Sequence, residues 1–545
     1  MGEPYFTPGV PLVLDRKGAG DARPGDLVIA SGRRGRAQVV GVIGSAKRIE
    51  NVLEGLLVEE GARTRFEPYE PREPDLEGRI DLRDELTFTI DPETAKDFDD
   101  ALTFKHEADG IRAFVHIADV SYFVRADSPL DHGAAARSFS TYVPGLVAPM
   151  LPPELADDLC SLRPHVDRLC VTVEIPFDGS LAPGEPSFYR SVIRSGARLT
   201  YTQAERILAG RERAEPAVVE ALGLAERVAT ALRDRRFARG ALRIESTEIA
   251  FAFDGNGGVE RAWRESEPHA HMLVEELMIL ANEAVAELLS GRRREALYRV
   301  HERPDPQAVG LLLAKLSELG VPTPPAPDRE LSPTEAAQIA AAASESVSGY
   351  VERAGRGREA FPTLVLRALK QARYDHRNLG HSGLASTAYC HFTSPIRRYP
   401  DLVCHRVLLR ELGADDDAVR GDLPEVAEHT SEREREAAQI EYRADEICLA
   451  WLLDSVLFER GWEEPFTGEI IGVIGSGIFV RFEDVFEGFL PARKLPGDYF
   501  EVDDLGTGLR GRRGGGGFRL GDQIGVTVAS IDRAEGKVEL APAVV

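Results

Sequence analysis

Alternating apolar and polar residues open the chain and predict short strands, which a helix then follows. The strand candidates are residues 10–14, 26–30 and 37–43, with glycine and proline turn signals between them. Apolar residues then recur three or four positions apart, as on one face of a helix: Ile49, Val52, Leu53, Leu56 and Leu57. We therefore expect residues 1–77 to form a small β-rich and helical module, which is a barrel, a winged-helix domain or a solvated cap.

The pattern changes twice further along the chain. Residues 67–75 carry three prolines and are typical of an extended acidic linker. Residues 78–460 then alternate strand-like and helical patterns, with the clearest long helices at 272–289 and 431–457. After Gly461 the predicted elements are short strands: residues 467–473, 477–482, 488–491, 523–531 and 537–540.

These patterns predict a multidomain α+β protein. Its central part is a mixed α/β domain over residues 78–460, which follows the small N-terminal β-rich and helical module. Five short strands in so small a segment suit a closed barrel of the OB-fold type, which we expect at residues 461–545. Hydrophobic residues make up 43% of the chain, which is enough for a sizeable core.

The overall charge is strongly acidic, because 66 Lys+Arg face 90 Asp+Glu and the formal net charge is -24. This balance argues against a protein that coats nucleic acid through its overall charge. Local basic regions remain. Residues 1–48 hold 8 basic and 4 acidic residues, and residues 510–519 hold four arginines among glycines, which predicts a flexible basic loop.

Other sequence features exclude several classes of protein. The 5 cysteines include no Cys-x-x-Cys pair, which argues against a disulfide framework and against a structural zinc site. No uninterrupted apolar run approaches the ~18 residues of a membrane span, and the first residues lack a signal pattern. No Gly-x-x-x-x-Gly-Lys-[Ser/Thr] loop for ATP is present. We expect a reduced cytoplasmic protein that uses neither membrane nor ATP.

Four aspartates directly after the strand candidate 86–90 form the strongest chemical signal: Asp91, Asp97, Asp99 and Asp100. Two carboxylates about 4 Å apart repel by roughly 4 kcal/mol at an effective dielectric constant near 20. A hard divalent cation removes that cost, and oxygen ligands suit Mg²⁺ or Mn²⁺. A calcium EF-hand loop would need glycine and glutamate where Leu102 and Ala108 stand. The alternative is a solvated acidic turn without a metal.

A second segment supplies positive charge. Residues 393–395, Thr-Ser-Pro, form a turn and helix-start signature, which places Arg397 and Arg398 in the first turn of a helix. Cations at that end of a helix are unfavourable unless an anion answers them. That anion is either a phosphate group or the aspartate cluster, and the alternative is ordinary pairing such as Arg398 with Asp401.

Several segments resemble the catalytic RNB domain of the bacterial ribonuclease II family, and they follow one another in the same order as in that family. They are residues 91–101, 116–121, 142–145, 150–155, 159–162 and 393–406. Members of this family are processive 3′→5′ exoribonucleases that hydrolyse single-stranded RNA to nucleoside 5′-monophosphates. The resemblance implies the same two-metal reaction here, with single-stranded RNA as partner and Mg²⁺ or Mn²⁺ as cofactor. It also implies that the protein is a monomer.

The resemblance also implies roles for the two charged segments. Asp91, Asp97, Asp99 and Asp100 would hold magnesium and the attacking water, with Asp99 the least dispensable. Arg397 would clamp the scissile phosphate, and Arg398 would contact the RNA beside it.

Aromatic and acidic side chains elsewhere match RNA contacts of the family. Tyr201 would pack at the 3′-terminal nucleotide, and Tyr142 would stack on the 5′ side of the bound stretch. Glu275 would accept a hydrogen bond from the terminal ribose, which selects RNA over DNA, unless it is only an exposed helix residue. The C-terminal barrel is similar to an S1 RNA-binding domain, in which Phe479 and Phe489 would stack on bases or else fill the core.

The chain departs from the family at three places. Ile244 stands where the family often has an aromatic residue, so the base clamp opposite Tyr201 would be looser. Too few residues precede the RNB resemblance for two cold-shock domains, so we expect a single cold-shock-like barrel or a winged helix. No Lys-rich tail follows the barrel, which weakens a resemblance to ribonuclease R.

Two other functions stay open. One is a catalytically silent RNA-binding or scaffold protein, which is disfavoured because such a protein does not need self-repelling carboxylates. The other is a DNA-directed nuclease, which Glu275 and the S1-like barrel disfavour. For the exoribonuclease, we expect positive potential along an internal RNA path while the outer surface stays acidic.

Overall fold

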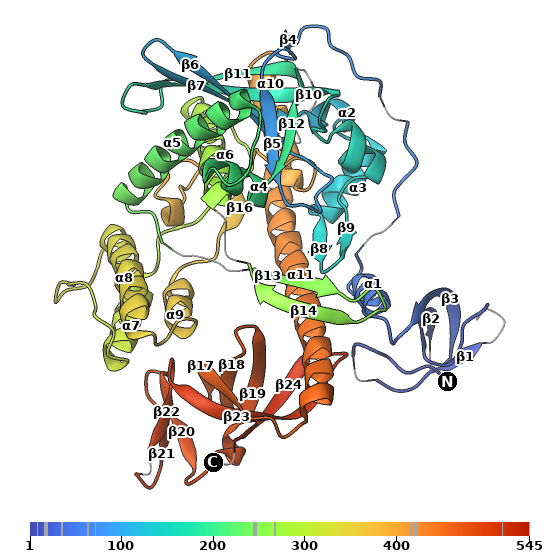
Figure 1. Ribbon diagram of the computed structural model, residues 1–545, viewed down its shortest axis with the longest axis vertical. Coiled ribbons are helices and arrows are strands. Elements are labelled where there is room, and N and C mark those ends of the chain that lie inside the picture. Colours follow the sequence, from blue (N-terminus) through green and yellow to red (C-terminus); the bar gives the residue numbers. More distant parts are fainter. Residues whose placement is uncertain are drawn as a thin grey trace.

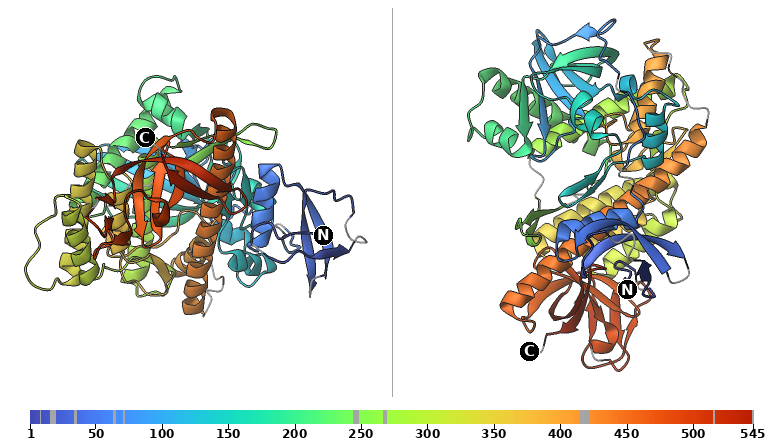
Figure 2. Two further views of the ribbon diagram at one scale, coloured as in Figure 1. Left: turned by 90° about the horizontal axis from the view of Figure 1, so that it is seen from below. Right: turned by 90° about the vertical axis from the view of Figure 1, so that its right-hand side faces the viewer.

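The computed structural model describes residues 1–543 with short gaps (Figures 1 and 2). The residues outside the description are 8, 16–19, 34–35, 63–64, 71, 244–247, 266–268, 415–416, 418–421, 515 and 544–545. Ile244, where the sequence departs from the family pattern, lies outside the described residues.

The N-terminal module is a three-stranded sheet followed by one helix. Its elements are β1 (Val13–Asp15), β2 (Asp26–Arg33), β3 (Arg36–Ser45) and α1 (Ile49–Glu59), and the strand order is β1-β3-β2. The predicted apolar stripe forms the buried face of α1, which packs with Phe6 and contacts the long helix α11 (Leu423–Arg460). The choice between a cold-shock-like and a winged-helix module stays a prediction.

The central domain is built on a seven-stranded sheet in the order β12-β5-β6-β7-β10-β11-β4. Its strands are β4 (Ile80–Asp81), β5 (Thr87–Asp91), β6 (Asp100–Glu107), β7 (Gly110–Ala118), β10 (Asp167–Asp178), β11 (Ser187–Arg194) and β12 (Ala197–Thr200). The edge pairs β12–β5 and β11–β4 are parallel, whereas the inner pairs are antiparallel.

Two apolar clusters hold helices against the two faces of this sheet. On one face, α4 (Tyr201–Leu208), α5 (Pro216–Ala238) and α6 (His269–Gly291) pack on alternate strand residues such as Leu102. On the other face, Ala101 belongs to a cluster with α2 (Val120–Phe123), α3 (Pro129–Arg137) and the first turn of α10 (Tyr399–Glu411). The sequence prediction of a long helix over 272–289 is confirmed by α6.

Two hairpins, a small strand pair and four further helices complete the region around this sheet. They are β8 (Thr141–Val143) with β9 (Leu146–Ala148), β13 (Ile249–Phe253) with β14 (Val259–Arg264), β15 (Tyr298–Val300) with β16 (Arg373–Asp375), α7 (Pro306–Glu318), α8 (Pro333–Ala354), α9 (Ala360–Ala368) and α11. Helix α11 has 38 residues and runs from the central domain to the barrel (Figure 1). It begins earlier than the predicted residue 431, because Pro424 starts a turn with favourable helix-start geometry.

The C-terminal region forms a closed barrel in the order β17-β18-β19-β24-β23, which confirms the expected OB-type fold class. The strands are β17 (Phe466–Ile474), β18 (Gly477–Phe482), β19 (Phe486–Pro491), β23 (Gln523–Asp532) and β24 (Lys537–Pro542). Residues 510–519 were expected to form a flexible loop, and this is wrong in part. They contribute to a separate sheet of β20 (Phe500–Val502), β21 (Gly508–Gly511) and β22 (Gly517–Arg519), and Arg510 pairs with Glu318 at 2.9 Å.

Cys160, Cys170, Cys390, Cys404 and Cys448 are all buried free thiols. Within the described ranges, none of the helices combines the length and the apolar character needed to cross a membrane.

Candidate active site

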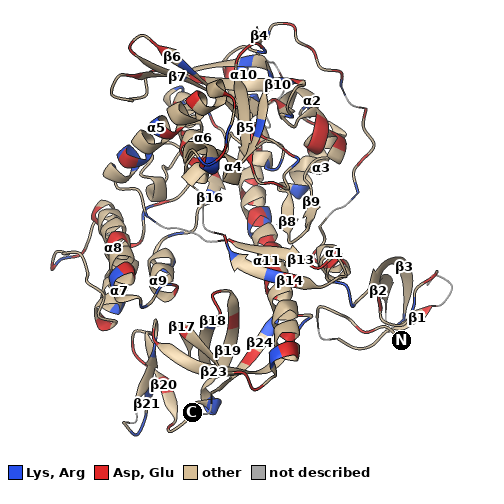
Figure 3. Cartoon of the chain, viewed as in Figure 1, with Lys and Arg blue, Asp and Glu red and all other residues tan. Residues whose placement is uncertain are grey.

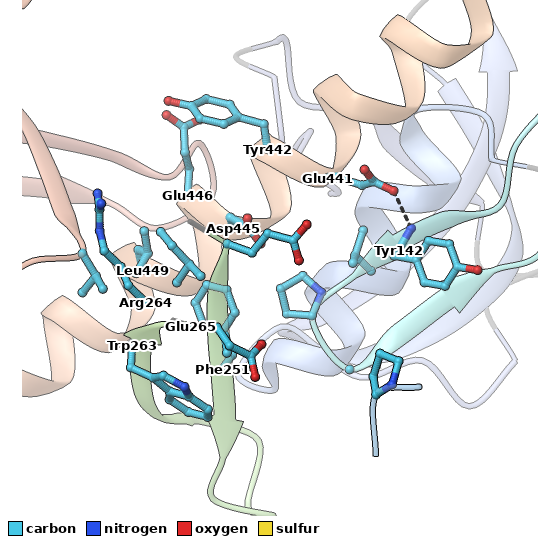
Figure 4. Close-up of a pocket in the computed structure, with 18 of the residues that line it drawn as sticks. Tyr142, Phe251, Trp263, Arg264, Glu265, Glu441, Tyr442, Asp445, Glu446 and Leu449 are labelled. Carbon is cyan, nitrogen blue, oxygen red and sulfur yellow. Dashed lines mark hydrogen bonds between the residues drawn. The ribbon is translucent and has the colours of Figure 1, made fainter. Parts of the chain in front are cut away.

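One large cavity lies where the central domain, the hairpin β13–β14, α11 and the barrel meet. Its volume is about 3130 Å³, and Figure 4 shows part of its wall. The described lining includes ten of the eleven predicted site residues: Asp91, Asp97, Asp99, Asp100, Tyr142, Tyr201, Arg397, Arg398, Phe479 and Phe489. Segments that are far apart in the sequence therefore meet around one space.

The strand register explains how the aspartates reach the cavity. β5 pairs with β6 only at Thr87 and Phe88, and from there the two strands diverge. The far end of β5 pairs with β12 instead, so Asp91 lies opposite Thr200. Residues 92–99 therefore form a loop at the cavity floor, and Tyr201, the first residue of α4, lies close to that loop.

Ser161 holds the aspartate loop from behind. Its hydroxyl accepts a hydrogen bond from the backbone N–H of Phe98 at 3.0 Å and donates one to the carbonyl of Lys96 at 2.6 Å. Ser161 belongs to the segment 159–162 that resembles the family, but sequence reasoning gave it no role. The sequence marked Ser161 only as part of a motif. Its hydrogen bond to Phe98 joins residues about sixty positions apart, so no local pattern predicts it.

Burial and mutual repulsion raise the pKa values of the carboxyl groups. Burial raises the pKa of Asp91 to about 6, and the charge of Asp97 adds to this shift. Burial raises the pKa of Asp100 to about 7, and the charge of Asp91 acts in the same direction. Burial also places the pKa of Asp99 well above its usual range, although the charge of Arg397 opposes the shift. Additional positive charge beside the cluster would therefore favour its full ionisation.

Arg397 faces the cluster directly. Asp99 accepts a hydrogen bond from the backbone N–H of Ile396 at 2.8 Å and another from Nε of Arg397 at 3.3 Å. The guanidinium also donates to the hydroxyl of Ser394 at 3.2 Å. The Arg397 side chain is 47% exposed, so it bridges the buried carboxylate and the open cavity. Within the structure, the negative charge that pairs with Arg397 is therefore that of the aspartate cluster.

Arg398 is engaged differently. Its guanidinium donates two hydrogen bonds to Asp401, at 3.0 and 2.8 Å, and Asp401 is fully buried. The expected alternative of an Arg398–Asp401 pair is therefore present. The predicted helix start was wrong, because α10 begins at Tyr399 and both arginines precede its first turn. The Thr-Ser-Pro segment forms a separate turn, in which the backbone N–H of Ser394 donates to Asp401 at 2.8 Å.

Two tyrosines lie near the cluster. Tyr142 donates from its hydroxyl to Asp97 at 2.7 Å, and its backbone N–H donates to Glu441 of α11 at 2.8 Å (Figure 4). Burial, followed by the charges of Asp100 and Asp91, raises the pKa of Tyr201. The ring of Tyr201 lies 5.1 Å from that of His271, a cavity residue on α6 that sequence reasoning missed.

Glu275 is the predicted site residue that the structure does not bring into the described lining. It is exposed on α6, one helical turn after His271. Its neighbour Glu276 is buried and pairs with Arg236. Helical periodicity explains the difference, because adjacent residues on a helix point to different sides. A role for Glu275 at the ribose stays a prediction.

Phe479 and Phe489 occupy the outer face of the barrel. Their ring centroids are 5.1 Å apart on the neighbouring strands β18 and β19. Ile478, Val480 and Leu490 alternate with them and are fully buried in the barrel interior. The two phenylalanines are partly exposed towards the cavity, so the barrel core does not account for them.

The charge of the cavity wall differs from the expectation. Of the described lining residues, 18 are acidic and 9 are basic, so the cavity wall as a whole does not have the excess of basic residues that a positive path leads one to expect. The acids include several on α11, where Figure 3 shows Asp and Glu. The two basic regions found in the sequence, residues 1–48 and 510–519, contribute nothing to the described lining. The composition showed which segments of the chain are basic, but it did not show where those segments lie in the folded protein.

The donor chemistry of the aspartate cluster fits a hard divalent cation. All four side chains offer oxygen ligands, and Oδ2 of Asp91 is buried with no hydrogen-bond partner among the described residues. No three His, Cys, Asp or Glu side chains in the described part of the chain already close around one point. The cluster is thus gathered on one cavity floor but open, with Asp97 and Asp99 bonded to Tyr142 and Arg397.

Comparison with known proteins gives a family match over most of the central domain. The family model described as "RNB domain" matches residues 79–414. Ribonuclease R of Escherichia coli (strain K12) is 39% identical over 478 residues, which are 85% of this chain and 57% of that protein. Ribonuclease R of Aquifex aeolicus is 37% identical over 482 residues, which are 87% of this chain and 66% of that protein. The chain thus spans 57 to 66% of these relatives, whose name is ribonuclease R although the lack of a Lys-rich tail pointed away from it.

Solved structures give the same result for the fold. Mycoplasma genitalium RNase R in complex with ribose methylated single-stranded RNA matches with a TM-score of 0.88 at 25% identity, covering 98% of this chain and 85% of that one. Yeast Ssd1, described as a pseudonuclease, matches with a TM-score of 0.68 at 18% identity, covering 89% of this chain and 62% of that one. The second match shows the fold alone.

Proposed function

Because the chain belongs to the RNB domain family, we propose that it is a hydrolytic exoribonuclease that shortens single-stranded RNA from the 3′ end. One observation carries the proposal: four aspartates and Arg397 meet on the floor of a single cavity. Nucleoside 5′-monophosphates are the expected products, and several rounds of cleavage per binding event are expected because the RNA would be held along the cavity. The ribonuclease R relatives and the RNA-bound relative support the choice of substrate.

We propose that Asp91, Asp97, Asp99 and Asp100 hold two Mg²⁺ ions, with Mn²⁺ as an alternative. When bound, such ions lower the pKa of water and offset the negative charge of an in-line transition state. The orphaned Oδ2 atom of Asp91 and the raised pKa values of Asp91 and Asp100 support this assignment. The carboxylates would then be ionised together without the repulsion that raises those pKa values.

The remaining side chains of the site would bind and orient the RNA. Nε of Arg397 donates a hydrogen bond to Asp99, and the exposed NH groups of the same guanidinium can bind a non-bridging oxygen of the scissile phosphate. The hydroxyl of Tyr142 fixes the orientation of Asp97 through their hydrogen bond. Tyr201 would pack against the 3′-terminal nucleotide beside His271, and Glu275 would reach its ribose from the exposed side of α6. Arg398 would support this arrangement through Asp401 and the turn before α10.

The three parts of the chain would then divide the work. Residues 78–460 would carry catalysis, and residues 461–545 would act as an S1 RNA-binding domain, with Phe479 and Phe489 stacking on bases. Residues 1–77 would add a small RNA-binding module, in which the local excess of basic residues is confined to residues 1–48.

The test uses a 5′-labelled single-stranded RNA, the matching DNA and a duplex with a 3′ overhang. In Mg²⁺ we expect shortening of the RNA to a short end product with release of nucleoside 5′-monophosphates, and no attack on DNA. EDTA and the variant Asp99→Asn should each abolish the reaction. Glu93→Gln is the matched control, because Glu93 is an exposed acid of the same loop outside the metal set. Internal RNA fragments, or equal cleavage of DNA, would contradict the proposal.

A silent RNA-binding protein is the second candidate, and the pseudonuclease described above shows that this fold alone does not guarantee cleavage. The distinction lies in the site. A protein without a metal-dependent reaction gains nothing from burying carboxylates that raise each other's pKa values. If Asp99→Asn binds RNA normally and the parent protein never shortens it, the silent candidate is correct.

A further inference from the structure

We propose that Trp263, with Arg261 beside it, is a further base-stacking contact for single-stranded RNA, on the hairpin that crosses the cavity. This inference rests on the proposed function, because it adds a contact for the same substrate. The hairpin β13–β14 lies between the central domain and the barrel, so a strand that reaches from the barrel to the aspartates passes it (Figure 1).

The two faces of this hairpin have different surroundings. Cross-strand partners share a face, and the register pairs Phe251 with Ala262 and Ala250 with Trp263. Phe251 and Ala262 pack against the large apolar cluster that includes residues of α11 and the barrel. Ala250 and Trp263 therefore point to the opposite side, and both line the cavity, as Phe251 also does from the packed face. Figure 4 shows the indole of Trp263 extending away from Tyr442 and Glu446 of α11.

The indole lacks the surroundings of a structural tryptophan. None of the four apolar clusters formed by the described residues includes Trp263, and the side chain is partly exposed. Trp451 is the contrasting case, because it belongs to the core cluster and is 6% exposed. The cross-strand neighbour of Trp263 is an alanine, which leaves room for a planar ring beside the indole.

Arg261 completes the contact with positive charge. Its guanidinium carbon lies 4.5 Å from the centre of the Trp263 ring, a cation–π geometry. An exposed arginine held against an aromatic ring offers donors to a phosphate while the ring offers a face to a base. This pairing matters in an acid-rich cavity, because RNA cannot be held there by the general charge of the wall. Stacking is independent of base identity, as a non-specific path requires.

The test measures RNA affinity in full-length Asp99→Asn protein, in which the strand is not consumed. The probe is a labelled single-stranded RNA, and each member of a series carries one abasic ribose at a different distance from the 3′ end. Trp263→Ala should weaken binding about five- to hundredfold, whereas Trp263→Phe, which keeps a ring, should stay within about threefold. One abasic position should cost affinity in the parent and cost nothing further in Trp263→Ala.

Trp462→Ala is the matched control, because Trp462 is 44% exposed but lies outside the described lining, and its removal should not change affinity. Arg261→Gln should weaken binding less at high salt than at low salt, as expected for a phosphate contact. Affinity of Trp263→Ala equal to that of the parent, or an abasic profile that Trp263→Ala leaves unchanged, overturns the inference. If the Asp99→Asn parent binds no RNA at all, the proposed function itself fails, so the two failures are distinguishable.

Discussion

Replacing Asp445 by asparagine should stabilise the protein, by an amount that grows as the pH rises. Asp445 lies on α11 at the cavity wall (Figure 4). Burial, followed by the charges of Glu441, Glu248 and Glu446, raises its pKa to about 7. In the folded protein, ionisation of this group is therefore opposed by its surroundings, whereas in the unfolded chain it is not.

The sign and the size of the effect follow from linkage. The folded pKa is raised above the ordinary value of 3.8, so the folded state loses stability as the pH climbs from about 4 to about 7 and recovers none above it. A shift of about 3 pKa units corresponds to roughly 4 kcal/mol at most. Because Asp445 is partly exposed, solvent and salt screen the repulsion, and we expect about 1 to 2 kcal/mol at pH 8. Asparagine removes this penalty while keeping the shape of the side chain.

Urea unfolding at pH 5 and pH 8, with EDTA in the buffer, measures the effect. The gain in the free energy of unfolding of Asp445→Asn should be larger at pH 8 by about 1 kcal/mol. Asp454→Asn on the same helix is the control, because Asp454 pairs with Arg533 at 3.0 Å and its neutralisation should bring no gain at either pH. A gain of the same size at both pH values, or a loss at pH 8, would refute the reasoning.

Three further predictions follow from individual contacts. Arg398→Ala should lower the free energy of unfolding by about 3–5 kcal/mol, because it leaves Asp401 buried and unpaired, and urea unfolding should show partial recovery in Arg398→Lys. Tyr142→Phe should lower kcat/KM on RNA about tenfold without changing stability at neutral pH, because the hydrogen bond that orients the carboxylate of the metal cluster is lost. Phe479→Ala and Phe489→Ala should each weaken binding of long RNA about five- to hundredfold but leave short RNA unaffected, as anisotropy titrations would show.

The sequence was sufficient for the architecture where periodicity is strong. The apolar stripe of α1 and the long helix α6 are visible because buried positions recur every three or four residues. The barrel is visible from short strands between turns. Local signals were weaker at element ends. The Thr-Ser-Pro signature predicted a helix start at residues 393–395, but Asp401 captures the backbone N–H of Ser394, and α10 begins only at Tyr399.

The candidate site was predictable in its residue types but not in its surroundings. The aspartates and Arg397 are marked by motif and charge, whereas Trp263 and His271 carry no signal until the hairpin and α6 are placed around the cavity. The charge of the wall is the clearest example. Four acidic residues of α11 line the cavity among residues contributed by many other parts of the chain, and the sequence alone does not show which face of that helix is turned to the cavity.

Helix α11 has a consequence for how this architecture can be altered. At about 1.5 Å per residue its 38 residues span about 57 Å without a break. The same helix contacts both halves of the protein. Its Glu441 accepts a hydrogen bond from the backbone of Tyr142, and its Asp445 lines the cavity. Its Asp454 forms an ion pair with Arg533 of the barrel. One residue inserted between Asp445 and Asp454 would rotate the barrel by about 100° relative to the catalytic floor. The helix before Gly461 therefore fixes the angular phase of the two halves, and an insertion or deletion within it should misplace the barrel relative to the catalytic floor.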